Sequence, residues 1–134
     1  MSGLQAFDVR QVWEQVRPGL DEIKGKTNPD WRPEDLYAAC LGKRAHIFMP
    51  DADATDFVLL AQNNCLYSGN AYLVVIAAYS KEGDAVETFQ SEIDDIARES
   101  GCSWIDFFSP RIGWERHARR HGYEPKATVF RRKL

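Results

Sequence analysis

One stretch, Ala71 to Pro110, restricts most strongly what this chain can fold into. Tyr72 to Tyr79 is an almost unbroken apolar run rich in β-branched and aromatic residues, which is the pattern of a strand buried on both faces. Apolar residues then recur at helical spacing from Asp84 to Ser100, and Trp104 to Phe108 predicts a second strand that ends before the proline. A strand, a covering helix and another strand within so short a stretch predict a right-handed crossover between two parallel neighbours.

The remaining segments predict helical covers and edge strands around this unit. Asp8 is placed to cap a first helix, which Pro18 should kink or break. Pro33 and the two acids that follow it are typical of the start of a second helix. The other predicted elements are strands at Ala45 to Met49 and at Asp56 or Phe57 to Gln62, a short helix at Gly113 to His121, and a last strand at Lys126 to Arg132.

Length and composition indicate one domain over residues 1–134, since 44% of the residues are hydrophobic. No apolar run is long enough for a membrane span and the first residues lack signal-peptide features, so we expect a cytoplasmic chain with no membrane partner. The three cysteines are widely spaced, which disfavours a disulfide framework and a cysteine zinc site. The acidic turn DADATD lacks the ligand spacing of a calcium loop, so we expect no metal.

The net charge of −3 hides a strong asymmetry along the chain. Residues 111–134 contain eight Lys or Arg against two acids, so this segment carries +6 and the preceding residues carry −9. Such a basic segment can bind a phosphate-bearing ligand or simply form a solvated face. Because no stacking aromatic residues are regularly interleaved with the charges, we do not expect a nucleic-acid partner.

The element order, together with the text SGCSWIDFFSPRIGWERHARRHGYEPKATVFRRKL, resembles the GNAT superfamily of N-acetyltransferases. This resemblance implies an α/β (α+β) fold: a mixed, mostly antiparallel sheet of five to six strands with a central parallel pair, flanked by about four helices. More narrowly, the phrase SPRIGWERHARRHGY is similar to the C-terminal half of acetyltransferase-like proteins encoded by tailed bacteriophages, some of which are associated with head assembly or the virion interior.

The resemblance also implies how acetyl-CoA would be held. In this superfamily backbone amides at the start of the crossover helix bind the pyrophosphate, in a turn that reads Arg or Gln, two residues, Gly, one residue, Gly or Ala. Here the turn SKEGDAVE keeps only Gly83, one place out of register, and Asp84 adds negative charge where the pyrophosphate would lie. The backbone of Ala77, Ala78 and Tyr79 would pair with the pantetheine arm, and Arg111 would approach the phosphates.

Catalysis in the superfamily also needs a proton donor for the departing thiolate and a base for the amine. The tyrosine that often serves as donor falls at Ala118 in this chain, so Tyr79 and His117, with His121 beside it, are the candidates. The central strand contains no acid, which makes Asp106 the nearest candidate base, although a structural carboxylate is an equally good interpretation.

Two functions from different classes therefore remain open. The first is an N-acetyltransferase that transfers acetyl from acetyl-CoA to an unidentified amine and has a degenerate pyrophosphate loop. The second is a protein that keeps the GNAT fold without its chemistry and binds a protein partner in bacteriophage assembly or in the virion. The first predicts a location in the bacterial or host cytoplasm, and the second an association with the virion.

Overall fold

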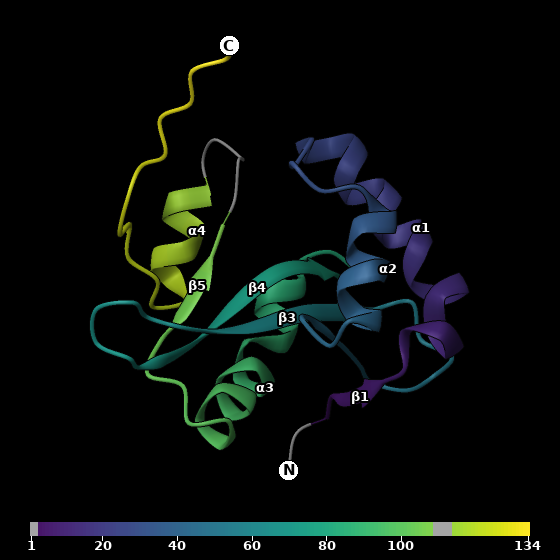
Figure 1. Cartoon of the computed structure of the whole chain (residues 1–134). Helices are drawn as coiled ribbons and strands as arrows, with labels where there is room; N and C mark the ends of the chain where they lie inside the picture. The colour runs from purple at the N-terminus through teal and green to yellow at the C-terminus, as the bar shows by residue number, and fades with distance from the viewer. Residues whose placement is uncertain (1–2, 109–113) are drawn as a thin grey trace.

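A computed structural model of the chain describes residues 3–108 and 114–134, and Figure 1 shows its arrangement. The elements follow one another along the chain in the order β1 (Gln5–Phe7), α1 (Val9–Thr27), α2 (Pro33–Leu41), β2 (His46–Met49), β3 (Phe57–Asn64), β4 (Ala71–Tyr79), α3 (Ala85–Glu99), β5 (Ile105–Phe107) and α4 (Trp114–Arg120).

The strands form one five-stranded sheet in the spatial order β1-β2-β3-β4-β5. Neighbours from β1 to β4 are antiparallel, whereas β4 and β5 are parallel and are joined through α3. The predicted mixed, mostly antiparallel sheet with one parallel pair and its crossover is therefore confirmed, but the pair lies at one edge of the sheet and not at its centre, because no strand follows β5 in the described residues. The sequence did not predict β1, because three residues at a sheet edge carry too short a pattern to be recognised.

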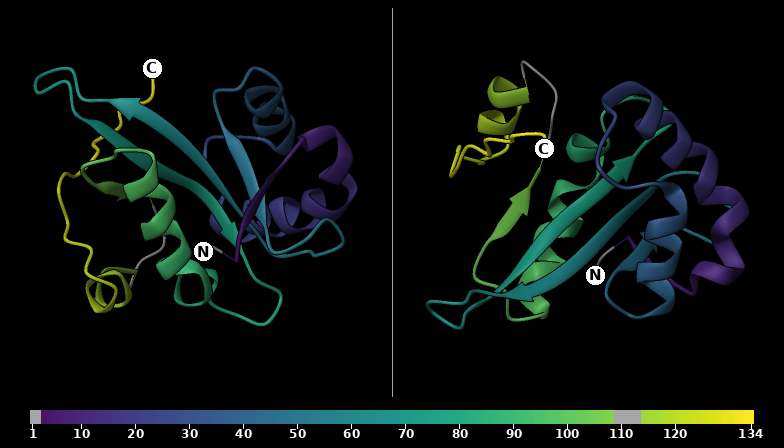
Figure 2. Two further views of the ribbon diagram at one scale, coloured as in Figure 1. Left: turned by 90° about the horizontal axis from the view of Figure 1, so that it is seen from below. Right: turned by 45° about the horizontal axis from the view of Figure 1, so that its top comes forward.

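Each face of the sheet packs against its own helices, as the left view of Figure 2 shows. Successive residues of β3 point to opposite faces, so Phe57 and Leu59 join the core beneath α1 and α2, while Val58 and Leu60 join the core beneath α3. All four side chains are at most 1% exposed. The continuous apolar strands are thus explained by burial on both faces.

Helix α1 begins as predicted but is not broken at Pro18. The Asp8 side chain accepts a hydrogen bond from the Arg10 amide at 3.0 Å, and the helix then runs to Thr27. Proline removes one helical hydrogen bond. The apolar stripe on both sides of Pro18, which includes Val16 and Leu20 at 0% exposure, packs against the sheet and holds the two halves in one helix. A break at Pro18, one of the two outcomes expected there, is therefore wrong.

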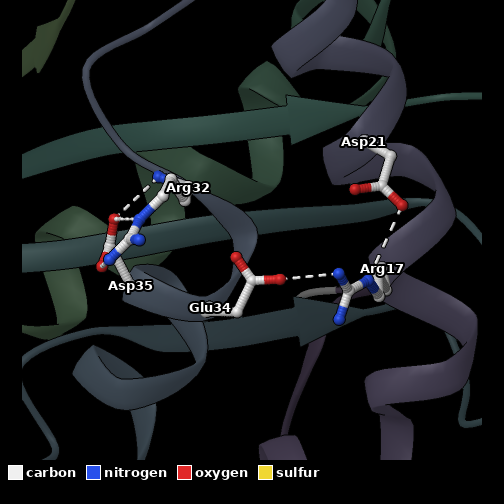
Figure 3. A network of polar contacts seen from close by, with 5 residues as sticks. All are labelled: Arg17, Asp21, Arg32, Glu34 and Asp35. Atoms are coloured by element: carbon white, nitrogen blue, oxygen red, sulfur yellow. Dashed lines mark hydrogen bonds and ion pairs between the residues drawn. The ribbon is translucent and has the colours of Figure 1, made fainter.

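Ion pairs join α1 to α2 on the outer surface, as Figure 3 shows. Arg17 on α1 donates to Glu34 of α2 at 2.6 Å, while Arg32 and Asp35 pair at the start of α2. All of these side chains are about half exposed or more, so water screens the pairs and they contribute little to stability. The helix pair is held instead by apolar packing.

The predicted last strand at Lys126 to Arg132 is wrong. Residues 123–134 form no helix or strand, and Figure 1 shows them running past α4 to the C-terminus. Val129 and Phe130 are 73% and 91% exposed, so their β-propensity is not accompanied by strand pairing or burial. Arg131 instead donates two hydrogen bonds to Asp30, at 2.8 and 2.7 Å, which tie the segment to the loop after α1.

Cys40, Cys65 and Cys102 are free thiols, and burial raises the pKa of Cys40 to about 11. Among the residues that the structure describes, none of the helices combines the length and the apolar character needed to cross a bilayer.

Gly19 marks where α1 approaches the sheet most closely. A Cβ at this position would lie 2.8 Å from Phe57 Cε1 and 2.9 Å from Tyr79 Cγ. We expect Gly19→Ala to lower the free energy of unfolding, because overpacking costs about 1–3 kcal/mol and the gain in helix propensity is at most about 1 kcal/mol. Urea unfolding measures the change.

Gly25 provides a matched control on the same helix. A Cβ there meets nothing within 4 Å, so Gly25→Ala should raise stability by about 0.5–1 kcal/mol. Equal stabilisation by both substitutions would show that α1 is not in close contact with the sheet at Gly19.

Candidate active-site groove

The parallel strands β4 and β5 separate after a short paired stretch. They pair only at Leu73, Val74 and Val75 of β4. On the other side of β4 the register with β3 shifts, since Leu60 pairs with Val75 and Leu59 with Ala77, which leaves Ile76 as an extra residue. Such a bulge bends a strand and increases its twist. Among the described residues, the rest of β4 up to Tyr79 therefore has a strand partner on one edge only.

A cavity of about 1000 Å³ lies along this free edge. That volume is at the upper end of the range of pockets that bind small molecules. The groove, as we call this cavity, is lined by the β4 residues 74–79, by Glu22, Lys26 and residues 28–31 from the end of α1 and its loop, by Gly83, Asp84 and Val86, by Phe107 and Phe108, and by His117, Val129 and Arg131. It thus contains most of the predicted cofactor-binding residues: Ala77, Ala78, Tyr79, Gly83 and Asp84.

Tyr79 lies in the groove with a partner that the sequence did not indicate. Its hydroxyl donates a hydrogen bond to Glu22 Oε2 at 2.7 Å, and Lys26 donates to the other oxygen of the same carboxylate at 2.7 Å. The hydrogen bond to Glu22 raises the pKa of Tyr79, with a further contribution from burial. The hydrogen bond from Lys26 and then that from Tyr79 lower the pKa of Glu22. The pair is therefore a neutral phenol beside an ionised carboxylate at neutral pH.

The phenol ring of Tyr79 packs on the ring of Phe57. The two rings are stacked, with centroids 5.9 Å apart and planes 22° from parallel. Phe57 is fully buried, and its packing restricts the position of the Tyr79 ring. Glu22 lies 57 residues away from Tyr79 in sequence, and its only local signal is the Lys26 four residues later on the same helix face.

The turn before α3 contains one glycine, and a side chain caps the first amides of the helix. Gly83 has a φ of +132°, which favours glycine, and forms a bridge with Ser80. Asp84 caps α3, because its Oδ1 accepts hydrogen bonds from the Val86 and Glu87 amides at 3.0 and 3.1 Å. Those amides are the donors that would bind an anion at a helix start. In this chain a carboxylate of the chain itself occupies them.

The two histidines of the C-terminal segment meet Asp84 at the same place. His117 Nε2 contacts Asp84 Oδ2, and the His117 and His121 rings have centroids 4.9 Å apart. The Nε2 atom of His121 is buried and has no hydrogen-bond partner in the described part of the chain. One ligand atom from each of Asp84, His117 and His121 lies within 4.8 Å of the others.

Asp106, the candidate base, is not brought together with Tyr79 and His117. It is half-buried in β5 and lines a second cavity of about 680 Å³ beside α3, together with His121 and Tyr123. In the same cavity the Tyr123 hydroxyl donates a hydrogen bond to Gln90 at 2.9 Å. Arg111, the remaining candidate for the phosphates, lies outside the described residues.

The fold is that of the GNAT acetyltransferases. The structure is similar to that of ribosomal-protein-alanine N-acetyltransferase from Brucella melitensis biovar Abortus 2308, with a TM-score of 0.72, 12% identity and coverage of 98% of this chain and 97% of that one. It is also similar to a GNAT family acetyltransferase from Staphylococcus aureus, with a TM-score of 0.65, 14% identity and full coverage of both chains. An aminoglycoside acetyltransferase from a soil metagenome, solved with sisomicin, gives a TM-score of 0.68 at 10% identity and covers 98% and 95%.

At these identities the likeness establishes the fold and leaves the chemistry to be argued from the groove. No protein-family model matches the sequence, and no curated protein sequence matches it either.

Proposed function

We propose that this protein is an N-acetyltransferase that uses acetyl-CoA and acts on an amine still to be identified. The observation that carries the proposal is the free edge of β4 at Ala77, Ala78 and Tyr79, which faces a groove of about 1000 Å³. An extended chain with amide groups, such as the pantetheine arm of CoA, can bind to such an edge by strand addition. Acetyl-CoA would supply the acetyl group as a thioester, whose C–S bond breaks as the amine nitrogen forms the new amide bond.

The proposed roles of the groove residues follow from their protonation. The Tyr79 hydroxyl keeps its proton at neutral pH because its pKa is raised, so Oη can donate that proton to the sulfur that leaves. Glu22 stays ionised because its pKa is lowered, and its negative charge attracts an amine in the ammonium form. Its hydrogen bond also holds the phenol in place. The ammonium loses one proton to water before its nitrogen attacks, and the second proton, lost as the amide forms, returns through water to the Tyr79 oxygen and restores the phenol.

A second function is favoured by the turn before α3. Asp84 already occupies the amides at the start of the helix, and its charge opposes a pyrophosphate at that position. The residues of this turn therefore do not fit the pyrophosphate part of CoA, although the β4 edge fits the pantetheine part. The alternative is a GNAT-fold binding protein without acetyl transfer, which uses its basic C-terminal segment to bind a protein partner during bacteriophage assembly or in the virion.

Calorimetry with acetyl-CoA separates the two functions. We expect the parent chain to bind with a dissociation constant in the micromolar range, which is typical of enzyme substrates. Asp84→Asn should bind about tenfold more tightly, since asparagine keeps the helix cap while the repulsive charge is removed. Asp51→Asn, which removes an exposed charge outside the groove, is the matched control and should leave the affinity unchanged.

One calorimetric result would contradict the acetyltransferase proposal. If neither the parent chain nor Asp84→Asn releases or takes up heat with millimolar acetyl-CoA, the acetyltransferase proposal is wrong and the binding protein remains.

A further inference from the structure

The geometry points to a metal site: we propose that Asp84, His117 and His121 bind one divalent transition-metal ion of the zinc class. The site is independent of acetyl transfer, because it is formed by the cap of α3 and the end of α4 and needs neither Tyr79 nor the free edge of β4.

The three side chains that would bind the metal already lie close together. His117 and His121 are four residues apart and therefore share one face at the end of α4, where their rings have centroids 4.9 Å apart. A donor atom from each histidine and a carboxylate oxygen of Asp84 lie within 4.8 Å of one another. In a tetrahedral zinc site, metal–ligand bonds of about 2.0–2.1 Å place the donors about 3.4 Å apart. Small rotations of the two imidazoles about their side-chain bonds close the remaining gap.

The two carboxylate oxygens of Asp84 have different partners. Oδ1 accepts from the Val86 and Glu87 amides, which fixes the side chain at the start of α3. Oδ2 is directed to the other side, where it contacts His117. A metal-binding carboxylate held by hydrogen bonds to its second oxygen is the usual arrangement in metal sites, because the outer partner orients the ligand.

His121 adds an observation that a simple ion pair between Asp84 and His117 does not explain. Its Nε2 atom is buried, and no described residue forms a hydrogen bond with it. Burying such a nitrogen without a partner costs free energy, so buried polar atoms without partners require an explanation. A bound ion would supply the missing partner for this nitrogen.

The ligand set indicates which ion fits and what the ion can do. Two imidazoles and one carboxylate are borderline ligands that suit zinc and its neighbours in the first transition row better than calcium or magnesium. Three protein ligands leave a fourth position for water or for a ligand, as in catalytic zinc sites. Asp84 and His117 line the groove, whereas His121 lines the second cavity.

Zinc titration of the untagged, metal-stripped full chain tests the proposal. Calorimetry should show one zinc ion per chain, and Co²⁺ in place of zinc should give the visible absorption bands of a four-coordinate site. His117→Gln and His121→Gln should each weaken zinc binding about 100-fold, since even the loss of an outer-shell partner costs 10–100-fold. Asp84→Asn should also weaken it while the cap of α3 is kept, which circular dichroism can verify.

Two further variants exclude other sources of zinc binding. His46→Gln removes the third histidine of the chain, which is exposed on β2, and should leave zinc binding unchanged. Cys65 is a partly exposed thiol whose pKa is lowered by a hydrogen bond with Ser68, so all titrations are repeated with Cys65→Ser.

If the parent chain takes up no more zinc than the double variant His117→Gln/His121→Gln, the metal site does not exist. This result would leave acetyl-CoA binding untouched, and a failure to bind acetyl-CoA would equally leave the zinc titration valid.

Discussion

Replacing Phe57 by alanine is expected to lower the free energy of unfolding by about 3–5 kcal/mol, the largest stability change that we predict for one side chain. Phe57 begins β3, is 0% exposed, and packs in the core beneath α1 and α2. Its ring also stacks on Tyr79 and lies beside Gly19, so neighbouring atoms cannot collapse fully into the space left by the ring. Chemical denaturation followed by tryptophan fluorescence measures the loss.

Phe130 is the matched control, because it is also a phenylalanine but is almost fully exposed. Its side chain is 91% exposed in the C-terminal segment, so Phe130→Ala should change stability by less than about 0.5 kcal/mol. A loss at Phe57 no greater than that at Phe130 would contradict the packing described for the core beneath the groove.

Removing the hydroxyl of Tyr79 is expected to lower the rate of acetyl transfer by about 10²–10⁴-fold, the usual contribution of a positioned proton donor. Tyr79→Phe keeps the ring stacked on Phe57 and removes only the hydroxyl that donates a hydrogen bond to Glu22. The fold and the affinity for acetyl-CoA should therefore be retained, and the loss should appear in kcat. Thiol release from acetyl-CoA in the presence of a panel of primary amines provides the assay.

The pH dependence gives this prediction a second readout. The hydrogen bond to Glu22 raises the pKa of Tyr79 above its ordinary value of 10.0, so the phenol stays protonated at neutral pH and loses its proton only in strongly alkaline solution. The ratio of parent to variant rates should thus be constant from about pH 6 to pH 9. Tyr72→Phe is the matched control on the same strand, because Tyr72 stacks on Trp104 and does not line the groove.

A variant Tyr79→Phe that transfers acetyl as fast as the parent would remove Tyr79 from the mechanism, whatever the role of the groove. A ratio that falls sharply between neutral and mildly alkaline pH would contradict the raised pKa of Tyr79.

The crossover unit was predictable because its signals are local. The apolar run of β4 and the helical spacing of α3 each report burial of that segment, and Asp84 with the residues around Gly101 marks the ends of the helix. The predicted bounds agree with the structure to within one or two residues at each end. Patterns of this kind depend only on residues within one helix or strand, so they can be recognised without knowledge of the rest of the fold.

The errors arose where distant parts of the chain decided the outcome. The helix passes through Pro18 because packing against the sheet outweighs one lost hydrogen bond. Lys126 to Arg132 has the composition of a strand but remains unpaired, since β-propensity stabilises a segment only where a neighbouring strand and a buried face are present.

The sequence by itself determined the strand–helix–strand unit, the turn at Gly83 with its acidic cap, and the candidacy of Tyr79 and His117. Only the tertiary structure decided that Glu22 holds the Tyr79 hydroxyl, that Asp106 lines a different cavity, and that His121 joins His117 at Asp84. The physical reason is that periodicity and capping are encoded within a few residues, whereas these contacts depend on where β4 and β5 separate and on how α1 and α4 lie at the ends of the strands.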